Sequence, residues 1–154
     1  MLNKSSEIKY HVLLAIEQYA IQYPKLVAPY YKKFYPLHLE KTYLIFQFYL
    51  IKLRYCKFIK LRILNEITQD WNFNEIFEEY REYVNCHSKE LTVFTLISIG
   101  KLASKCPKYA IKCVKYLINN VLGKNSFLAS KSIVALSEYL QHVKLFLMIR
   151  ISSL

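Results

Sequence analysis

The stretch "LTVFTLISIGKLASKCPKYAIKCVKYL", residues 91–117, decides the fold. Its first half is apolar on almost every side, whereas its second half carries lysines at a regular helical spacing. A helix that is apolar nearly all round must contact neighbours on several sides, and a helix with one polar stripe keeps one face for water. Both kinds of helix occur next to each other in a stack of antiparallel helix pairs. The stretch therefore predicts two consecutive helices of such a stack.

Local signals bound these two helices. Ser88 is expected to cap the first, which runs to about Lys105, and Gly100 inside it would let a neighbouring helix approach closely. Pro107 fits the first turn of the second helix, where its missing N–H costs nothing, and Gly123 fits just past the end. The narrow polar stripe expected on the first helix consists of Ser98, Lys101 and Lys105. The packed face expected on the second helix consists of Ala110, Cys113, Val114, Leu117, Ile118 and Val121.

The rest of the chain also reads as helical. Helices are expected over about 5–22, 41–68 and 73–84, and from Asn125 or Ser126 onwards. Three prolines in 24–36 permit only short helical turns there. Tyr, Phe and Ile are dense enough in 42–51 to leave a strand open, although the length and the helical neighbours favour a helix. Asn72 can cap the helix that follows it, with Glu75 in a capping-box relation. The packed face expected on that helix consists of Ile76, Phe77, Tyr80 and Val84.

The spacing of these helices indicates the fold class. The pairs 41–68/73–84 and 90–105/107–122 start roughly 45 residues apart, near the repeat period of armadillo and HEAT proteins. Gly and Pro are scarce, with 2 and 4 residues, which disfavours a β-sandwich or barrel. The sequence predicts an all-α fold, an armadillo/HEAT-like α-solenoid fragment of antiparallel helix pairs. A plain helical bundle remains the alternative.

Composition and charge restrict the functional classes. The net charge of +11 favours acidic partners, whether nucleic acid, anionic lipid headgroups or acidic protein faces. The longest apolar run, "TYLIFQFYLI" at 42–51, is about half of the ~20 residues that a membrane-spanning helix needs. Four cysteines without a CxxC pair, and no secretory signal before them, predict reduced thiols in the cytosol.

Two groups of basic residues are the candidate contact sites. The first is interleaved with Tyr55 and Phe58, an arrangement that nucleic-acid-binding surfaces also use. On a solenoid, the same side chains more often form the wet stripe of a helix or bind an acidic partner or a lipid headgroup. The first group is Lys52, Arg54, Lys57, Lys60 and Arg62, and the second is Lys108, Lys112 and Lys115.

Residues for chemistry are not arranged in a recognisable pattern. Cys106 and Cys113 lie seven positions apart and Cys86–His87 precedes them, but structural zinc ligands usually follow C-x₂₋₄-C or H-x₃₋₅-H spacing. The four histidines are scattered, with no Ser or Cys nucleophile placed beside a base. The glutamates of 75–82 fit a solvated helix face better than a carboxylate site. We therefore expect no enzyme, no catalytic or metal site and no cofactor.

Four segments carry a resemblance to a known family. They are "APYYKKFY" at 28–35, "KLRILNEITQDWNFNEIFEEYREYV" at 60–84, "TLISIGKLASKCPKYAIKCVKYL" at 95–117 and "SKSIVALSEYL" at 130–140. Their order, and mostly their spacing, resembles the trunk domain of beta adaptins, the large beta subunits of vesicle-coat adaptor complexes, nearest the type of the third adaptor complex. The pattern covers roughly 10–140, with about a dozen additional residues between Tyr35 and Lys60.

This resemblance implies a fold and a function. It implies an armadillo-like trunk segment over 1–142 with an extra segment within 36–56, and a tail, 143–154, outside the family pattern. The implied role is a non-enzymatic scaffold in vesicle-mediated protein transport, peripheral on Golgi, endosomal or coated-vesicle membranes. The implied partners are other adaptor-complex subunits, with cargo or clathrin-type coat proteins. Trunks of the family are several times longer, so a fragment of a longer beta adaptin is expected; a basic nucleic-acid-binding module or another armadillo/HEAT scaffold is the alternative.

Overall fold

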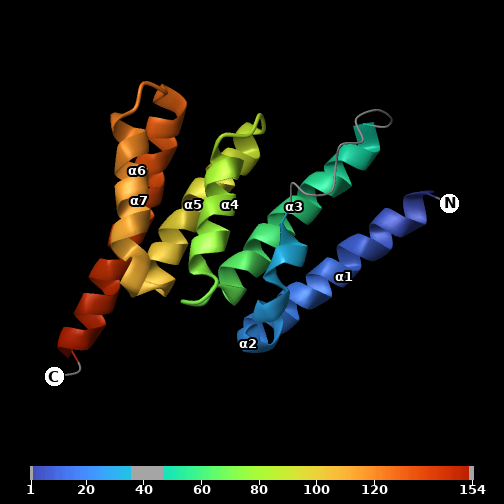
Figure 1. Cartoon of the computed structure of the whole chain (residues 1–154), viewed down its shortest axis with the longest axis horizontal. Coiled ribbons are helices and arrows are strands. Elements are labelled where there is room, and N and C mark those ends of the chain that lie inside the picture. Colours follow the sequence, from blue (N-terminus) through green and yellow to red (C-terminus); the bar gives the residue numbers. More distant parts are fainter. Residues whose placement is uncertain (1, 36–46, 153–154) are drawn as a thin grey trace. The chain divides into compact units, whose positions relative to one another are not determined.

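The computed structural model describes the backbone of residues 2–35 and 47–152, and the side chains of 7–35 and 55–145. Within these ranges all regular structure is helical, so the predicted all-α fold is confirmed. The chain divides into two compact units, residues 1–79 and 80–154. The elements, shown in Figure 1, are α1 (Leu2–Gln22), α2 (Pro24–Val27), η1 (Ala28–Phe34), α3 (Gln47–Ile67), α4 (Phe73–Val84), α5 (Lys89–Lys105), η3 (Pro107–Tyr109), α6 (Ala110–Leu122) and α7 (Ser126–Ser152).

The first unit is built on α1 and α3, which lie side by side and run in the same direction (Figure 1). The prolines break the chain after α1 into the four-residue α2 and the short 3-10 helix η1, as the sequence predicts. Both short helices contact α3. The core joins the inner faces of these elements to the first turns of α4, and consists of Ala20, Val27, Tyr31, Phe34, Leu61, Leu64, Ile67, Phe73, Ile76 and Phe77.

An ion pair between exposed Arg62 and buried Glu17 links the two long helices of this unit. The Arg62 guanidinium on α3 donates to both carboxylate oxygens of Glu17 on α1, with Nη2 2.9 Å from Oε2 and Nε bound to Oε1. Glu17 is 7% exposed, so the two parallel bonds satisfy a carboxylate that has almost no access to water. The hydrogen bonds that Arg62 donates to Glu17 raise the pKa of Arg62.

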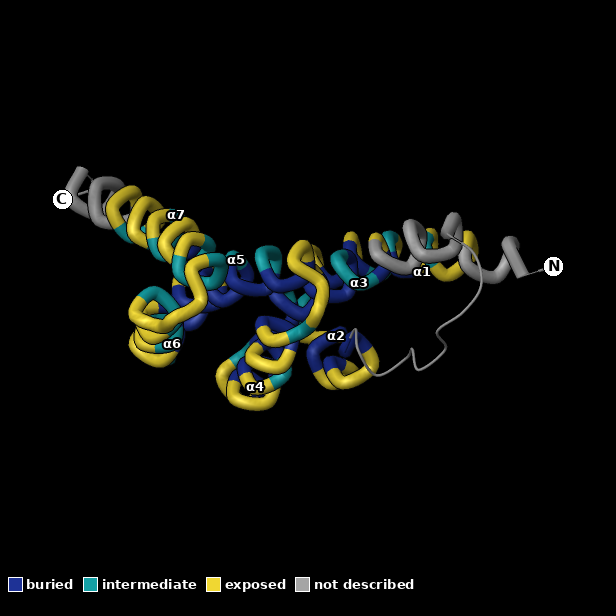
Figure 2. Tube along the Cα trace, turned by 90° about the horizontal axis from the view of Figure 1, so that it is seen from above, coloured by how far each residue is buried: buried dark blue, intermediate teal, exposed yellow. Residues whose placement is uncertain are grey.

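The second unit places α5 between other helices. It contacts both α6 and α7, and Figure 2 shows much of it buried, whereas α6 is largely exposed. This arrangement confirms the contrast predicted from residues 91–117. Ser88 caps α5 as predicted, because its Oγ accepts from the Leu91 amide at 3.3 Å. At the same end, the Thr92 hydroxyl donates to the Val84 carbonyl at 3.2 Å, which ties α5 to the last turn of α4.

Gly100 lies where α5 and α7 meet. A Cβ built on this residue would be 2.8 Å from the Ala135 carbonyl oxygen, closer than real Cβ contacts allow. Helices α5 and α7 run in the same direction, with α6 antiparallel to both (Figure 1). The predicted close helix approach at Gly100 is therefore confirmed, and the partner is the backbone of α7.

Two expectations need correction, and two others are not tested by the described residues. Helix α1 begins at Leu2 rather than near Ser5. Ser98 is buried at 1% exposed, because α5 has neighbours on the side where a polar stripe was expected. Helix α7 continues as far as Ser152, and that residues 143–154 lie outside the family pattern stays a prediction. The predicted extra segment lies partly outside the described residues, which exclude 36–46, and its remainder belongs to α3.

The Asn72 side chain binds the turn that precedes α4. Its Oδ1 accepts from the Gln69 amide at 2.7 Å and its Nδ2 donates to the Ile67 carbonyl at 3.2 Å. Asn72 is completely buried, and these bonds satisfy its amide group inside the α3–α4 connection. The proposed capping-box partner, Glu75, has other partners, which are described below. Asn72 thus fixes the turn, a role that the capping pattern did not predict.

Candidate functional site

The basic group predicted on α3 does not form one accessible surface. The side chains of Lys52 and Arg54 lie outside the described residues. Lys57 is half-buried, and Lys60, expected on a wet stripe, is instead buried at 5% exposed. Position 60 faces inward because α3 has α1, α2 and η1 around it. Arg62 already donates to Glu17. The described side chains of this group are therefore poorly placed to bind a phosphate group.

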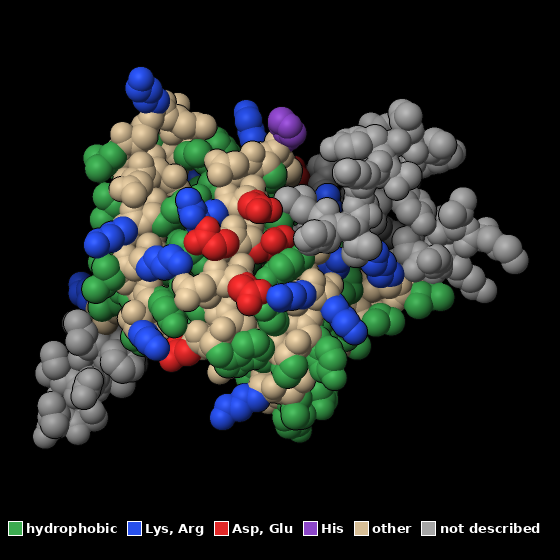
Figure 3. Space-filling view, viewed as in Figure 1, with side chains coloured by type: hydrophobic (Ala, Val, Ile, Leu, Met, Phe, Trp, Pro, Cys, Tyr) green, Lys and Arg blue, Asp and Glu red, His purple; other side chains and the backbone are tan. Residues whose placement is uncertain are grey.

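The three lysines predicted on the second site lie together on an exposed face. Lys108 belongs to η3 and Lys112 and Lys115 to α6, and all three are exposed. Their spacing of four and three positions places them on one side of the helix. Figure 3 shows lysine and hydrophobic side chains interleaved over α6. The apolar members of this surface include Ile111, which is 70% exposed.

An apolar groove lies beside these lysines, between α6 and α7. Its volume is about 420 Å³, within the usual range of binding pockets. Its lining is mostly aliphatic and ends in one ammonium group: Ile118, Val121, Ile133, Leu136, Leu140 and Lys144. Ile118 was expected to fill the packed face of its helix, but it is 42% exposed. The helical period placed Ile118 on the apolar face of α6. It could not show whether another helix covers that part of the face.

A polar cluster in the first unit joins η1 to α4. The Tyr31 hydroxyl donates to Glu75 Oε2 at 2.6 Å, and the Lys32 ammonium lies 2.8 Å from the same oxygen. These hydrogen bonds, first from Lys32 and then from Tyr31, lower the pKa of Glu75. Glu75 is exposed, which agrees with the solvated helix face predicted for it. Its bonds also connect elements more than forty positions apart, a pairing that no local pattern could reveal.

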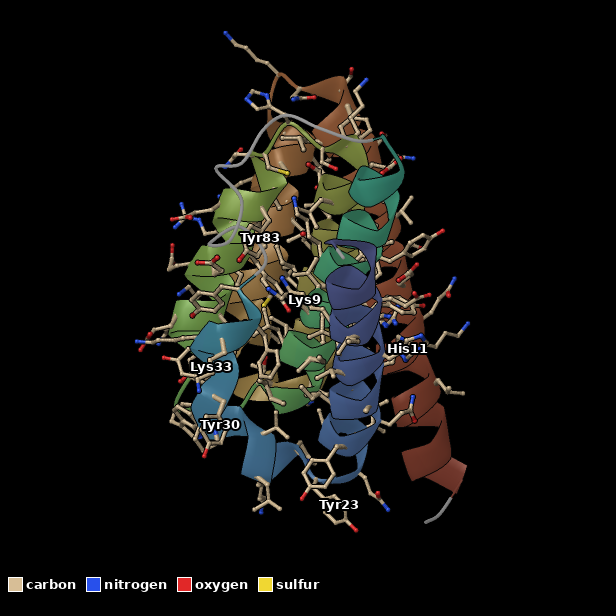
Figure 4. The ribbon with its side chains drawn as sticks, turned by 90° about the vertical axis from the view of Figure 1, so that its right-hand side faces the viewer. Lys9, His11, Tyr23, Tyr30, Lys33 and Tyr83 are labelled. Atoms are coloured by element: carbon tan, nitrogen blue, oxygen red, sulfur yellow. The ribbon has the colours of Figure 1, made fainter. Side chains whose placement is uncertain are left out.

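An exposed aromatic surface on the same segment was also missed. Tyr23, Leu26 and Tyr30 are each about half exposed or more, at 46%, 61% and 55%. Figure 4 shows Tyr30 and Lys33 on the outer side of η1, and the Lys33 ammonium is 5.3 Å from the centre of the Tyr30 ring. The spacing of these residues repeats every three or four positions, so the signal was present in the sequence. It was hidden by the three prolines, which suggested only a connection.

The thiols were considered as metal ligands. Within the described residues, no group of three or more His, Cys, Asp and Glu side chains could hold a metal ion. All four cysteines are thiols and not disulfides, and Cys56, Cys106 and Cys113 are buried. The part of the chain that the structure describes also contains no helix that is long and apolar enough to cross a membrane.

The thiol of buried Cys113 should react more slowly than the thiol of partly exposed Cys86. Burial raises the pKa of its thiol to about 12, so almost no thiolate is present near neutral pH. Cys86 is partly exposed and should react first. Alkylation of the native chain with iodoacetamide, mapped by mass spectrometry over time, measures this difference. Equal labelling of Cys113 and Cys86 in the folded chain would contradict the described burial.

Comparison with known proteins adds a relationship to this geometry. No protein-family model matches the chain. Over 141 residues, which are 92% of its length, the chain is 25% identical to the AP-3 complex subunit beta-1 of Bos taurus. Over the same length it is 24% identical to the Homo sapiens subunit beta-1 and 22% identical to the Mus musculus subunit beta-2. These similarities support a relationship to the adaptin family.

The match is long relative to this chain but short relative to the adaptins. The chain spans 12% of the length of these AP-3 subunits. An identity of 22–25% extending over most of the helices agrees with the motif resemblance to beta adaptins. It is consistent with the described structure, in which the strongly patterned positions form a helical core.

Proposed function

We propose that the chain is a non-enzymatic scaffold segment of an adaptor-complex beta subunit of the AP-3 type, acting in vesicle-mediated intracellular protein transport. The single observation that carries this proposal is the similarity to AP-3 beta subunits over 92% of the chain. The helical structure supports it, because surfaces formed by stacked helices bind proteins without needing a catalytic centre. The polar clusters that the structure describes are engaged in structural bonds, as at Glu17 and Glu75.

The proposed partners follow from the same similarity. The beta segment would contact other adaptor-complex subunits, and through the assembled complex it would reach cargo or clathrin-type coat proteins. Its proposed location is cytoplasmic, peripheral on Golgi, endosomal or coated-vesicle membranes. The exposed lysines Lys108, Lys112 and Lys115 remain the proposed contacts for a partner or a headgroup. Lys57 is a weaker candidate since it is half-buried.

A chimera tests the proposed function. The 141 matched residues of the Homo sapiens AP-3 subunit beta-1 would be replaced by the matching part of this chain. The chimera should recover the small and medium subunits of the complex in a pull-down, because the inserted helices should restore the scaffold. A beta subunit that lacks these residues is the negative control, and the unaltered subunit is the positive one. A folded chimera that recovers no more than the deletion control would refute the proposal.

The nucleic-acid alternative has a separate test. Two of its five predicted basic residues, Lys60 and Arg62, are buried or already bound to a carboxylate. A filter-binding titration of the whole chain against RNA and DNA at increasing salt would detect phosphate contacts, since they impose a steep loss of affinity with ionic strength. Tight, salt-sensitive binding, together with failure of the chimera, would favour this alternative.

A further inference from the structure

We draw no further inference here: the strongest candidate, the apolar groove between α6 and α7, is the open flank of the last helix pair in a chain that spans 12% of the AP-3 subunits it matches, and nothing in the structure shows what covers it.

Discussion

Replacing Gly100 by alanine should lower the free energy of unfolding by about 1–3 kcal/mol. The added methyl carbon would lie 2.8 Å from the Ala135 carbonyl oxygen, an atom of the α7 backbone that cannot rotate away. Helices α5 and α7 would have to separate, and the contacts along their shared face would weaken. Alanine favours a helix over glycine by about 1 kcal/mol, so the steric cost must exceed this gain.

The other glycine of the chain provides the matched control for this substitution. A Cβ at Gly123 would be 3.3 Å from the Asn120 carbonyl oxygen, and the φ angle of Gly123 is −73°, which any residue adopts. Gly123→Ala should therefore change the free energy of unfolding by about 0.5 kcal/mol or less. Urea denaturation followed by far-ultraviolet circular dichroism measures both variants. A stabilised Gly100→Ala variant would show that the helices do not approach as described.

Replacing Phe77 by alanine should lower the free energy of unfolding further, by about 3–5 kcal/mol. Phe77 is 2% exposed, and its ring stacks on that of Phe73, with centroids 5.6 Å apart and planes at 15°. Truncation would remove this contact and leave a cavity in the core of the first unit, because the neighbouring helices can relax only partly. The loss is large enough to threaten a protein of ordinary stability.

Trp71 is the control for the Phe77 substitution, because it is a larger aromatic residue six positions away. It is 61% exposed, and its described ring contact is an edge-on approach to Tyr31, with centroids 5.7 Å apart. Trp71→Ala should therefore cost only about 1 kcal/mol. Chemical denaturation of both variants gives the comparison. If Trp71→Ala lowered the free energy of unfolding as much as Phe77→Ala, the size of the side chain and not its burial would determine the loss of stability.

The sequence predicted those features that depend on neighbours along the chain. The cap at Ser88, the breaks at the prolines and the buried stripe of Ile76, Phe77, Tyr80 and Val84 follow from local periodicity and backbone chemistry. It also identified Gly100 as a place of close approach. A helical period shows which side chains share a face, and this was sufficient for the helix pattern and most of the core.

The candidate site was less predictable, because it depends on which faces are covered. Lys60 and Ser98 are polar and were placed in water, yet both are buried by helices distant in sequence. Ile118 is apolar and was placed in the core, yet it lines an open groove. Glu75 is exposed as predicted, but its partners on η1 were not predicted. In each case the deciding contact is between segments far apart in the chain.

The exposure of Trp71 has a consequence for optical experiments on this protein. It is the sole tryptophan of the chain, so all indole emission reports on one position in the connection between α3 and α4. Because water already surrounds much of its ring, global unfolding should shift its emission maximum only slightly. Quenching by acrylamide should be efficient even for the native chain. Loss of the hydrophobic core would thus be nearly silent in tryptophan fluorescence, whereas a ligand that covers the surface around Trp71 would be reported with little background.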